Sequence, residues 1–124
     1  MLAYCGLIFS VSSVQGDDLP GFFPYMDKIA HLLEYSLFGL LAGRAIRATF
    51  SGWSAVAFTI ATVALGGLVG LLDEFYQRSV PGRQSDAFDL LVDMGAVAAA
   101  VLFAQWVHIL PLGGGGPATQ DKGR

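Results

Sequence analysis

The sequence predicts an all-α protein, an integral membrane bundle of four transmembrane helices. Hydrophobic residues make up 54% of its 124 residues and charged residues only 14%, and the mean hydropathy is +0.58. A water-soluble domain of this length would leave many Leu, Phe and Val side chains in water, and each forfeits roughly 1.5 to 3 kcal/mol when it stays exposed. Four apolar stretches, separated by polar connections, give the number of helices.

The first apolar stretch, residues 1–14, is the shortest. At about 1.5 Å of rise per residue it does not cross a hydrocarbon core about 30 Å thick, so we expect it to tilt little or to begin further upstream. A cleaved signal peptide is the competing interpretation, although no Lys or Arg precedes the apolar run. The single cysteine, Cys5, permits no intrachain disulfide and is expected to pack as a small apolar residue.

The other three stretches are residues 29–48, 53–72 and 87–112, and each is long enough to span a membrane. Beyond the last of them the chain is rich in glycine and polar residues. The sequence therefore predicts one transmembrane domain over residues 1–112 and a disordered cytoplasmic tail over residues 113–124.

The basic residues determine the expected orientation in the membrane. One predicted side carries Arg44, Arg47, Lys122 and Arg124, and the other carries Lys28, Arg78 and Arg83. Lys and Arg are enriched on the cytoplasmic side, and the acidic pair Asp17 and Asp18 lies with the smaller basic set, so both termini are predicted to be cytoplasmic. We expect Arg47 to lie in a solvated connection.

Polar and ionisable residues gather at the outward ends of three predicted helices. The second helix carries Asp27, Lys28, His31, Glu34 and Tyr35, the third carries Asp73, Glu74 and Gln77, and the fourth carries Asp86, Asp89 and Asp93. Residues three or four apart lie on one face of a helix, so Asp27, His31 and Tyr35 should stack, as should the three aspartates. Together with Arg83 in the third connection, these residues form the predicted binding site or polar network.

Burial limits how the carboxylates can be placed. A carboxylate at membrane depth costs several kcal/mol, so Glu34, Asp89 and Asp93 are expected to face the interior of the bundle and to find partners there. A structural polar network that closes this end of the bundle is the alternative to a functional site.

Arg83 is the predicted anchor of the network. Its planar guanidinium can hold a carboxylate through two hydrogen bonds, and Asp73 or Asp86 is the expected partner. Pro81 and Gly82, which precede it, indicate a turn between the third and fourth helices.

Small residues four apart follow the polar residues along the three long helices. They are Gly39 with Gly43, Gly66 with Gly70, and Gly95 with Ala99. In lipid this spacing lets helix backbones approach closely. We therefore expect these helices to form a tight core next to the polar residues.

Several kinds of site are disfavoured by the sequence. G-x-S-x-G, H-E-x-x-H and Walker motifs are missing, and a net charge of −3 without a basic stripe argues against a nucleic-acid partner. A divalent ion could be held by His31, Glu34, Asp73 and Glu74. Because that set has a single histidine, we expect neither a metal nor a cofactor. His108, at the other end of its helix, is expected to be an interfacial or satisfied imidazole.

The polar residues form three short motifs in a fixed order. D-K-x-x-H covers residues 27–31 and precedes Tyr35, D-E-x-x-Q covers residues 73–77, and P-G-R covers residues 81–83 and precedes Ser85, Asp86 and Asp89. In this combination the chain, over residues 1–112, resembles the VanZ-like family of bacterial membrane proteins, although Gly95 follows Asp93 more closely than the family spacing. The resemblance implies a bacterial inner-membrane protein whose founding relative confers low-level resistance to lipid-tailed glycopeptides such as teicoplanin.

Three functions remain open on the sequence. The leading hypothesis is a non-enzymatic envelope protein that binds a membrane lipid or lipid-linked ligand at its outward polar residues, where Lys28 and Arg83 would meet an anionic headgroup. The second is an enzyme acting on a lipid-linked substrate, with a carboxylate as general base and His31 as its partner. The third is a small transporter or proton relay, suggested by Glu34 and Asp93.

Overall fold

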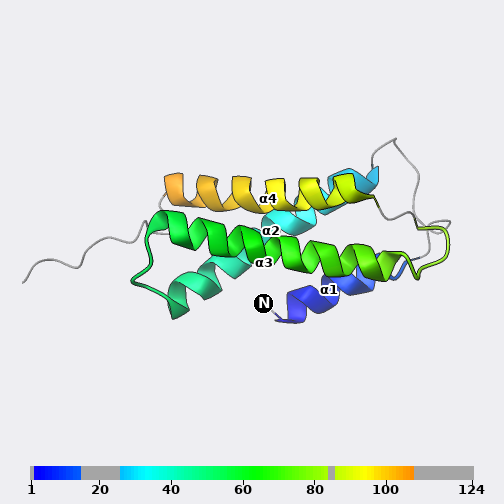
Figure 1. The fold of residues 1–124 in the computed structure, drawn as a ribbon, viewed down its shortest axis with the longest axis horizontal. Coiled ribbons are helices and arrows are strands. Elements are labelled where there is room, and N and C mark those ends of the chain that lie inside the picture. The colour runs from blue at the N-terminus through cyan, green and yellow to red at the C-terminus, as the bar shows by residue number, and fades with distance from the viewer. Residues whose placement is uncertain (1, 15–25, 84–85, 108–124) are drawn as a thin grey trace, which may run out of the picture.

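Four α helices form the part of the chain that the computed structural model describes, residues 2–14, 26–83 and 86–107. They are α1 (Leu2–Ser12), α2 (Met26–Thr49), α3 (Ala55–Gln77) and α4 (Ala87–Trp106). Figure 1 shows α3 and α4 running along the length of the bundle with α2 packed against them, while α1 lies along α3 over only part of that length. The predicted all-α bundle is confirmed. The expected tail, residues 113–124, and His108 lie outside the described residues.

Within the described parts of the chain, three helices are long and apolar enough to cross a membrane, namely Lys28–Thr49 within α2, α3 and α4. The helix α1 has 11 residues, so its axis is about 16 Å long, roughly half of a hydrocarbon core. Its brevity agrees with the sequence prediction for the first stretch.

The fourth helix ends earlier than the apolar pattern suggested. The C-cap of α4 is Val107, whose backbone N–H binds the Phe103 carbonyl, whereas the prediction extended this helix to residue 112. Pro111 limits how far a helix could extend, because a proline ring clashes with the carbonyl four residues before it and disfavours a helical conformation in the residue it follows; residues 108–112 themselves lie outside the described residues.

Side-chain caps fix where α3 and α4 begin. The Ser54 hydroxyl accepts a hydrogen bond from the Ala57 backbone N–H at 3.2 Å, and the Asp86 carboxylate accepts one from the Phe88 backbone N–H at 2.9 Å. Ser and Asp are preferred at this position because they satisfy amide groups that have no partner within the helix. The start of α4 therefore depends on a residue that also belongs to the predicted site.

Close approach of α4 to α2 and α3 is made possible by glycine. A Cβ on Gly39 would lie 3.1 Å from the backbone of Val97, one on Gly66 would lie 2.7 Å from the Val97 side chain, and one on Gly70 would lie 2.8 Å from an Asp93 oxygen. The predicted role of these glycines is thus confirmed. The prediction for Gly95 is wrong, since it is exposed and a Cβ there would meet open space.

The face of α4 that packs is set by its buried residues. Asp93 and Val97 are buried one turn apart, and at 3.6 residues per turn Gly95 and Ala99 fall on the opposite face. Both are exposed. Spacing alone identified the pair but not the side of the helix on which it lies.

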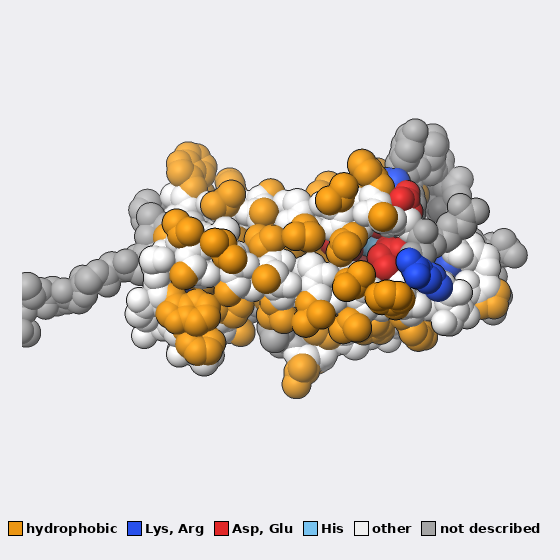
Figure 2. All heavy atoms as spheres, viewed as in Figure 1, with side chains coloured by type: hydrophobic (Ala, Val, Ile, Leu, Met, Phe, Trp, Pro, Cys, Tyr) orange, Lys and Arg blue, Asp and Glu red, His pale blue; other side chains and the backbone are white. Residues whose placement is uncertain are grey.

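Apolar side chains cover much of the outer surface as well as the core. The core contains Tyr35, Phe38, Phe58, Val97 and Val101, and Cys5 packs against it as a partly buried residue. Figure 2 shows other apolar side chains spread over the face in view, and many large ones are more than half exposed, such as Leu33, Val56, Ile60, Leu91 and Phe103. An apolar surface this continuous is suited to lipid and not to water.

Arg47 is buried, contrary to the expectation of a solvated connection. Because α2 continues to Thr49, Arg47 lies inside the last turns of the helix. Its Nη1 donates to the Trp53 carbonyl at 2.9 Å, and its guanidinium lies 4.1 Å from the ring centroid of Phe58. Arginine can be buried this way because its stem is apolar and its planar head packs on aromatic rings.

Candidate functional site

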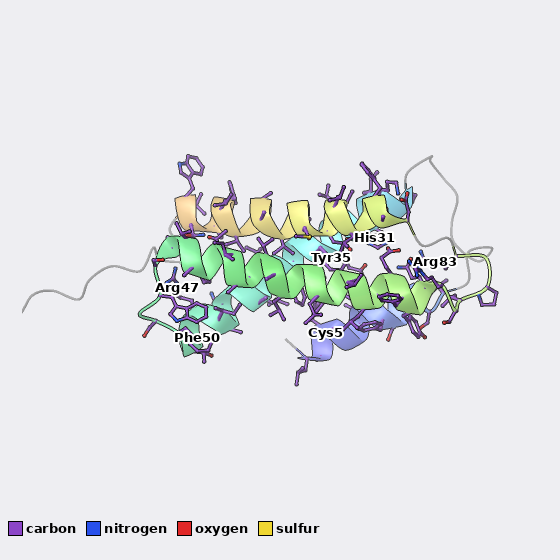
Figure 3. All side chains as sticks on the ribbon, in the orientation of Figure 1. Cys5, His31, Tyr35, Arg47, Phe50 and Arg83 are labelled. Atoms are coloured by element: carbon purple, nitrogen blue, oxygen red, sulfur yellow. The ribbon has the colours of Figure 1, made fainter. Side chains whose placement is uncertain are left out.

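The described polar residues of the predicted site gather where α2 begins, α3 ends and α4 begins. We call this region the polar end, and its members are Lys28, His31, Asp73, Glu74, Gln77, Arg83, Asp86, Asp89 and Asp93. Figure 2 shows the charged side chains visible on that face grouped at one end of the bundle, and Figure 3 places His31 and Arg83 toward that end, away from Arg47. Asp93 lies about 9 Å along α4 from its first residue. The predicted convergence of three helices is therefore present.

Two pairs of side chains join α2 to α4. The Lys28 ammonium makes ion pairs with Asp89 and, at 3.4 Å, with Asp86. One turn deeper, His31 Nδ1 lies 2.9 Å from Asp93 Oδ1. Asp89 and Asp93 are both buried, so the expectation that they face the interior is confirmed.

The remaining residues of the predicted α2 face differ in how they are placed. The His31 and Tyr35 rings are parallel within 6°, with centroids 6.1 Å apart, and Tyr35 is fully buried. Glu34 is half-buried, and its backbone carbonyl accepts a hydrogen bond from the Tyr4 hydroxyl of α1 at 2.9 Å. The side chain of Asp27 lies outside the described part of the structure.

On α3 the residues of the D-E-x-x-Q motif form hydrogen bonds with two neighbouring helices. Gln77 Nε2 donates to Asp73 Oδ2 at 2.8 Å and to the Ser12 hydroxyl at 3.2 Å, and all three residues are buried. Glu74 Oε2 accepts a hydrogen bond from the Asp86 backbone N–H at 3.0 Å. The motif therefore ties α3 to α1 on one side and to the start of α4 on the other.

Ser12 also contacts this group of residues, but the sequence did not predict it as part of the site. It is nearly fully buried although it ends the short apolar stretch. The available signal was the pair of hydroxyl residues at 12 and 13, since Ser13 also contacts α3, with its hydroxyl 2.8 Å from that of Tyr76. Polar side chains at the end of a membrane helix that pack on a neighbour usually hydrogen-bond across the interface.

Arg83 does not pair with Asp73 or Asp86, so that prediction is wrong. Its Nε donates to the Val14 carbonyl and its Nη2 to the Val11 carbonyl, each at 3.2 Å. Carbonyls at the end of a helix attract cations, and Arg83 binds one carbonyl in the last turn of α1 and one just beyond it. Lys28 pairs with Asp86 instead.

A tight turn brings Arg83 to this position. Gly82 has a φ of 74°, and the Arg83 backbone N–H binds the Val80 carbonyl at 3.2 Å. Proline followed by a residue with positive φ is typical of a type II turn, and glycine adopts that φ without strain. The P-G-R motif is thus a turn that directs an arginine onto α1.

Buried acid outweighs buried base at the polar end. Asp73, Glu74, Asp89 and Asp93 are each no more than 4% exposed, and Asp73 Oδ1 and Asp93 Oδ2 have no hydrogen-bond partner among the described residues. Asp86 is more exposed, and its pKa is lowered by the Phe88 backbone N–H and by Lys28.

Three of the buried side chains at the polar end come close enough to share a ligand. His31, Glu74 and Asp89 place ligand atoms within 4.8 Å of one another.

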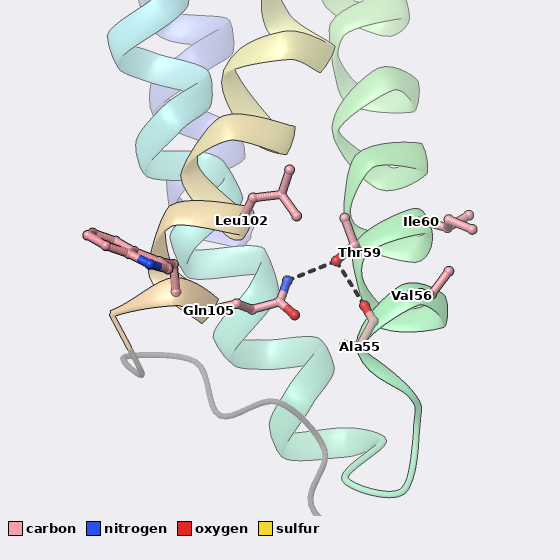
Figure 4. A pocket seen from close by; sticks show the side chains of 7 residues that line it. Ala55, Val56, Thr59, Ile60, Leu102 and Gln105 are labelled. Atoms are coloured by element: carbon pink, nitrogen blue, oxygen red, sulfur yellow. Dashed lines mark hydrogen bonds between the residues drawn. The ribbon is translucent and has the colours of Figure 1, made fainter.

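A groove of about 420 Å³ lies between α3 and α4 at the opposite end. Figure 4 shows Gln105 donating to the Thr59 hydroxyl across it, at 2.8 Å, and Leu102, Val56 and Ile60 are among its apolar lining residues. Gln105 is buried and Thr59 is half-buried. The residues that line this groove include no acid or base, in contrast to the polar end.

One comparison with known proteins gives a match. Residues 3–109 match the family model described as VanZ/LLP1, a range that includes α1 to α4 almost entirely and every residue of the polar end. Neither the curated proteins nor the solved structures yield a significant match to this chain.

Proposed function

Because the chain belongs to the VanZ/LLP1 family, we propose that this membrane protein acts at the bacterial cell envelope, where its polar end binds a membrane lipid or lipid-linked ligand. The proposal includes a location in the bacterial inner membrane, with the polar end outward and both termini in the cytoplasm. Through such a ligand the protein would alter how a lipid-tailed glycopeptide of the teicoplanin type meets the cell surface.

The observation that carries the proposal is the position of the polar end next to an apolar surface. Lys28 is at the rim, with its Nζ 5.5 Å from the centroid of the exposed Phe88 ring. Arg78 lies similarly over the exposed Phe75 ring, at 4.9 Å. A lipid has the same arrangement, an anionic headgroup attached to acyl chains, so a cation beside an exposed aromatic ring suits both of its parts.

The cations that would meet the headgroup differ from those expected on the sequence. Arg83 donates to two carbonyls at the end of α1, so Arg78, which is exposed, takes its place beside Lys28 in the proposal. The buried carboxylates behind them would hold the two cationic side chains at the rim and would exclude a second anion.

An enzyme on a lipid-linked substrate is the second candidate, favoured by the contact between His31 and Asp93. A carboxylate that binds one imidazole nitrogen orients the ring and raises the basicity of the other nitrogen, as a general base requires. Incubation with extracted envelope lipids separates the two candidates. A binder copurifies with an anionic lipid of unchanged mass, an enzyme changes the mass, and a proton relay instead makes liposomes leak protons.

The first prediction tests the proposed role of the polar end. Production of the protein in a sensitive Gram-positive host should raise tolerance to a lipid-tailed glycopeptide more than to a glycopeptide without the tail. Asp73→Asn keeps the shape of a fully buried side chain that binds Gln77 but removes its charge, and should abolish the effect. The measurements are the minimal inhibitory concentrations and the abundance of each variant in the membrane fraction.

Membrane abundance separates loss of function from loss of protein. The proposal requires the Asp73→Asn variant to be as abundant as the wild type while conferring no tolerance. Full tolerance in this variant, or no tolerance to either compound with the wild type, would contradict the proposed role.

A further inference from the structure

We propose that His31, Glu74 and Asp89 bind one divalent transition-metal ion, and that Asp93 orients the histidine for it. The inference concerns the ion alone and holds whichever lipid the protein binds. It departs from the sequence expectation of no metal, which was based on a single histidine in a set with Glu34, Asp73 and Glu74. Of those three carboxylates only Glu74 belongs to the group that the structure brings together, and Asp89 is new to it.

The three candidate ligands come from three different helices. His31 is on α2, Glu74 on α3 and Asp89 on α4, and each offers a ligand atom within 4.8 Å of the other two. All three side chains are buried, with exposures of 5%, 4% and 3%. Ligands around one ion lie about 2.0 to 2.3 Å from it, so small side-chain rotations on fixed helix backbones would close the site.

Asp93 supports the histidine in the way typical of metal centres. It is fully buried, and its Oδ1 lies 2.9 Å from His31 Nδ1. This contact makes Nδ1 the donor and leaves Nε2 as the nitrogen with a free lone pair. A carboxylate bound to the far nitrogen of a metal-ligating histidine fixes the ring and its tautomer, and such partners are common around bound metals.

Charge balance favours a cation at this position. Asp73 and Asp93 are buried, and each has one carboxylate oxygen without a hydrogen-bond partner among the described residues. A buried carboxylate without sufficient countercharge is costly at membrane depth, and a divalent ion would supply positive charge at this end of the bundle. Lys28 contacts Asp89 through Oδ1 and also contacts Asp86, so the second oxygen of Asp89 remains for the ion.

The donor set indicates which ions would bind. One imidazole and two carboxylates suit Zn²⁺ or Mn²⁺, whereas Mg²⁺ retains several waters and Ca²⁺ prefers six or more oxygen ligands. Affinity at such a site rises from Mn²⁺ to Zn²⁺. With three protein ligands, the fourth position would be open to water or to an oxygen of a ligand.

The test is a titration of the purified full-length protein in detergent, after removal of metals with a chelator. The wild type should bind one Zn²⁺ per chain, and Mg²⁺ at the same concentration should not compete. Glu74→Gln and Asp89→Asn should each lose this stoichiometric binding, and Asp93→Asn should weaken it about 10- to 100-fold, the range seen for such supporting residues.

Asp86→Asn is the matched control. Asp86 is an acid at the same end that also contacts Lys28, but it is exposed and is not one of the three ligands, and asparagine caps a helix as well as aspartate does. Its affinity for Zn²⁺ should equal that of the wild type. Absence of stoichiometric Zn²⁺ binding by the wild type, or equal losses in Asp86→Asn and Glu74→Gln, would overturn the proposal.

A measurement on the wild type alone covers the case in which a variant fails to fold. X-ray absorption at the zinc edge should show one imidazole nitrogen among oxygen ligands in the first shell. A first shell without imidazole would overturn the assignment even if zinc binds.

Discussion

Lys28 is the residue on which the charge balance of the polar end most directly depends. It contacts one carboxylate that is buried, Asp89, and one that is half exposed, Asp86. The two contacts should therefore differ in energy, because a buried ion whose partner is removed loses several kcal/mol of stabilisation while an exposed ion pair contributes about 1 kcal/mol or less.

Replacement of Lys28 tests this difference. Lys28→Met keeps most of the side-chain volume and leaves Asp89 buried without its ammonium, so we expect destabilisation of a few kcal/mol, less than the roughly 3 to 5 kcal/mol of a fully buried pair, because Lys28 is 21% exposed. The measurement is the thermal midpoint in detergent with a chelator present, so that no metal ion compensates.

Second substitutions separate the two contacts. Asp89→Asn in the Lys28→Met background should recover part of the lost stability, since it removes the uncompensated charge. Asp86→Asn in the same background should recover little. If both recover stability equally, Asp89 is not buried as the structure describes.

The pairing of individual residues was only partly predictable from the sequence. Helical spacing placed His31, Asp89 and Asp93 correctly, because residues three and four apart share a face whatever surrounds them. It could not decide between Lys28 and Arg83 as the partner of Asp86, since both side chains are long and the outcome depends on where α1 ends. The Val11 carbonyl in the last turn of α1 and the Val14 carbonyl just beyond it accept hydrogen bonds from Arg83, and these contacts determine where the arginine binds.

At the scale of the helices, the close contact between α4 and its two neighbours centres on Val97. Its backbone faces Gly39 of α2 and its side chain faces Gly66 of α3. Without a hydrophobic driving force between helices in lipid, such packing contributes much of the association energy. The bundle should therefore be most sensitive to added volume at these glycines.

Gly66→Leu is expected to force α3 from α4. A Cβ at this position would already lie 2.7 Å from Val97 Cγ2, and overpacking of a well-packed core costs typically about 1 to 3 kcal/mol. The abundance of the folded protein in membranes, measured by detergent extraction and size-exclusion chromatography, should fall. Gly95→Leu is the control, because Gly95 faces open space, and equal losses in both variants would contradict the packing.

The positions of the helices were largely predictable, but their ends and outward faces were less so. Apolar length identified α2, α3 and α4, but hydropathy did not register where α4 ends, at Trp106. The burial of Arg47 was likewise unpredictable, because it depends on contacts with Trp53 and Phe58, residues of the next connection and helix.

At the scale of the whole molecule, residues 50–54 and 78–83 lie at opposite ends of the bundle, and the proposed orientation places residues 50–54 in the cytoplasm. A topology reporter fused after Ser51, or after Gly116, should therefore report cytoplasm, and one fused after Ser79 should report the outside. Alkaline phosphatase and green fluorescent protein fusions give opposite readings for each site and serve as mutual controls. The reverse pattern would place the polar end in the cytoplasm and end its proposed meeting with an external antibiotic.

Because Arg47 is buried in the last turns of α2, the distance along this helix from Lys28 to Arg47 can be compared with the thickness of a membrane. Lys28 and Arg47 are 19 residues apart in the sequence, which corresponds to about 28 Å along a helix axis. The exposed Trp53 and Trp106 rings lie toward the Arg47 end of the bundle, where interfacial aromatic residues normally sit. The charges at both ends of α2 therefore match a bilayer of ordinary hydrophobic thickness, about 30 Å, and the protein fits such a membrane with little hydrophobic mismatch to be relieved by thinning the surrounding lipid.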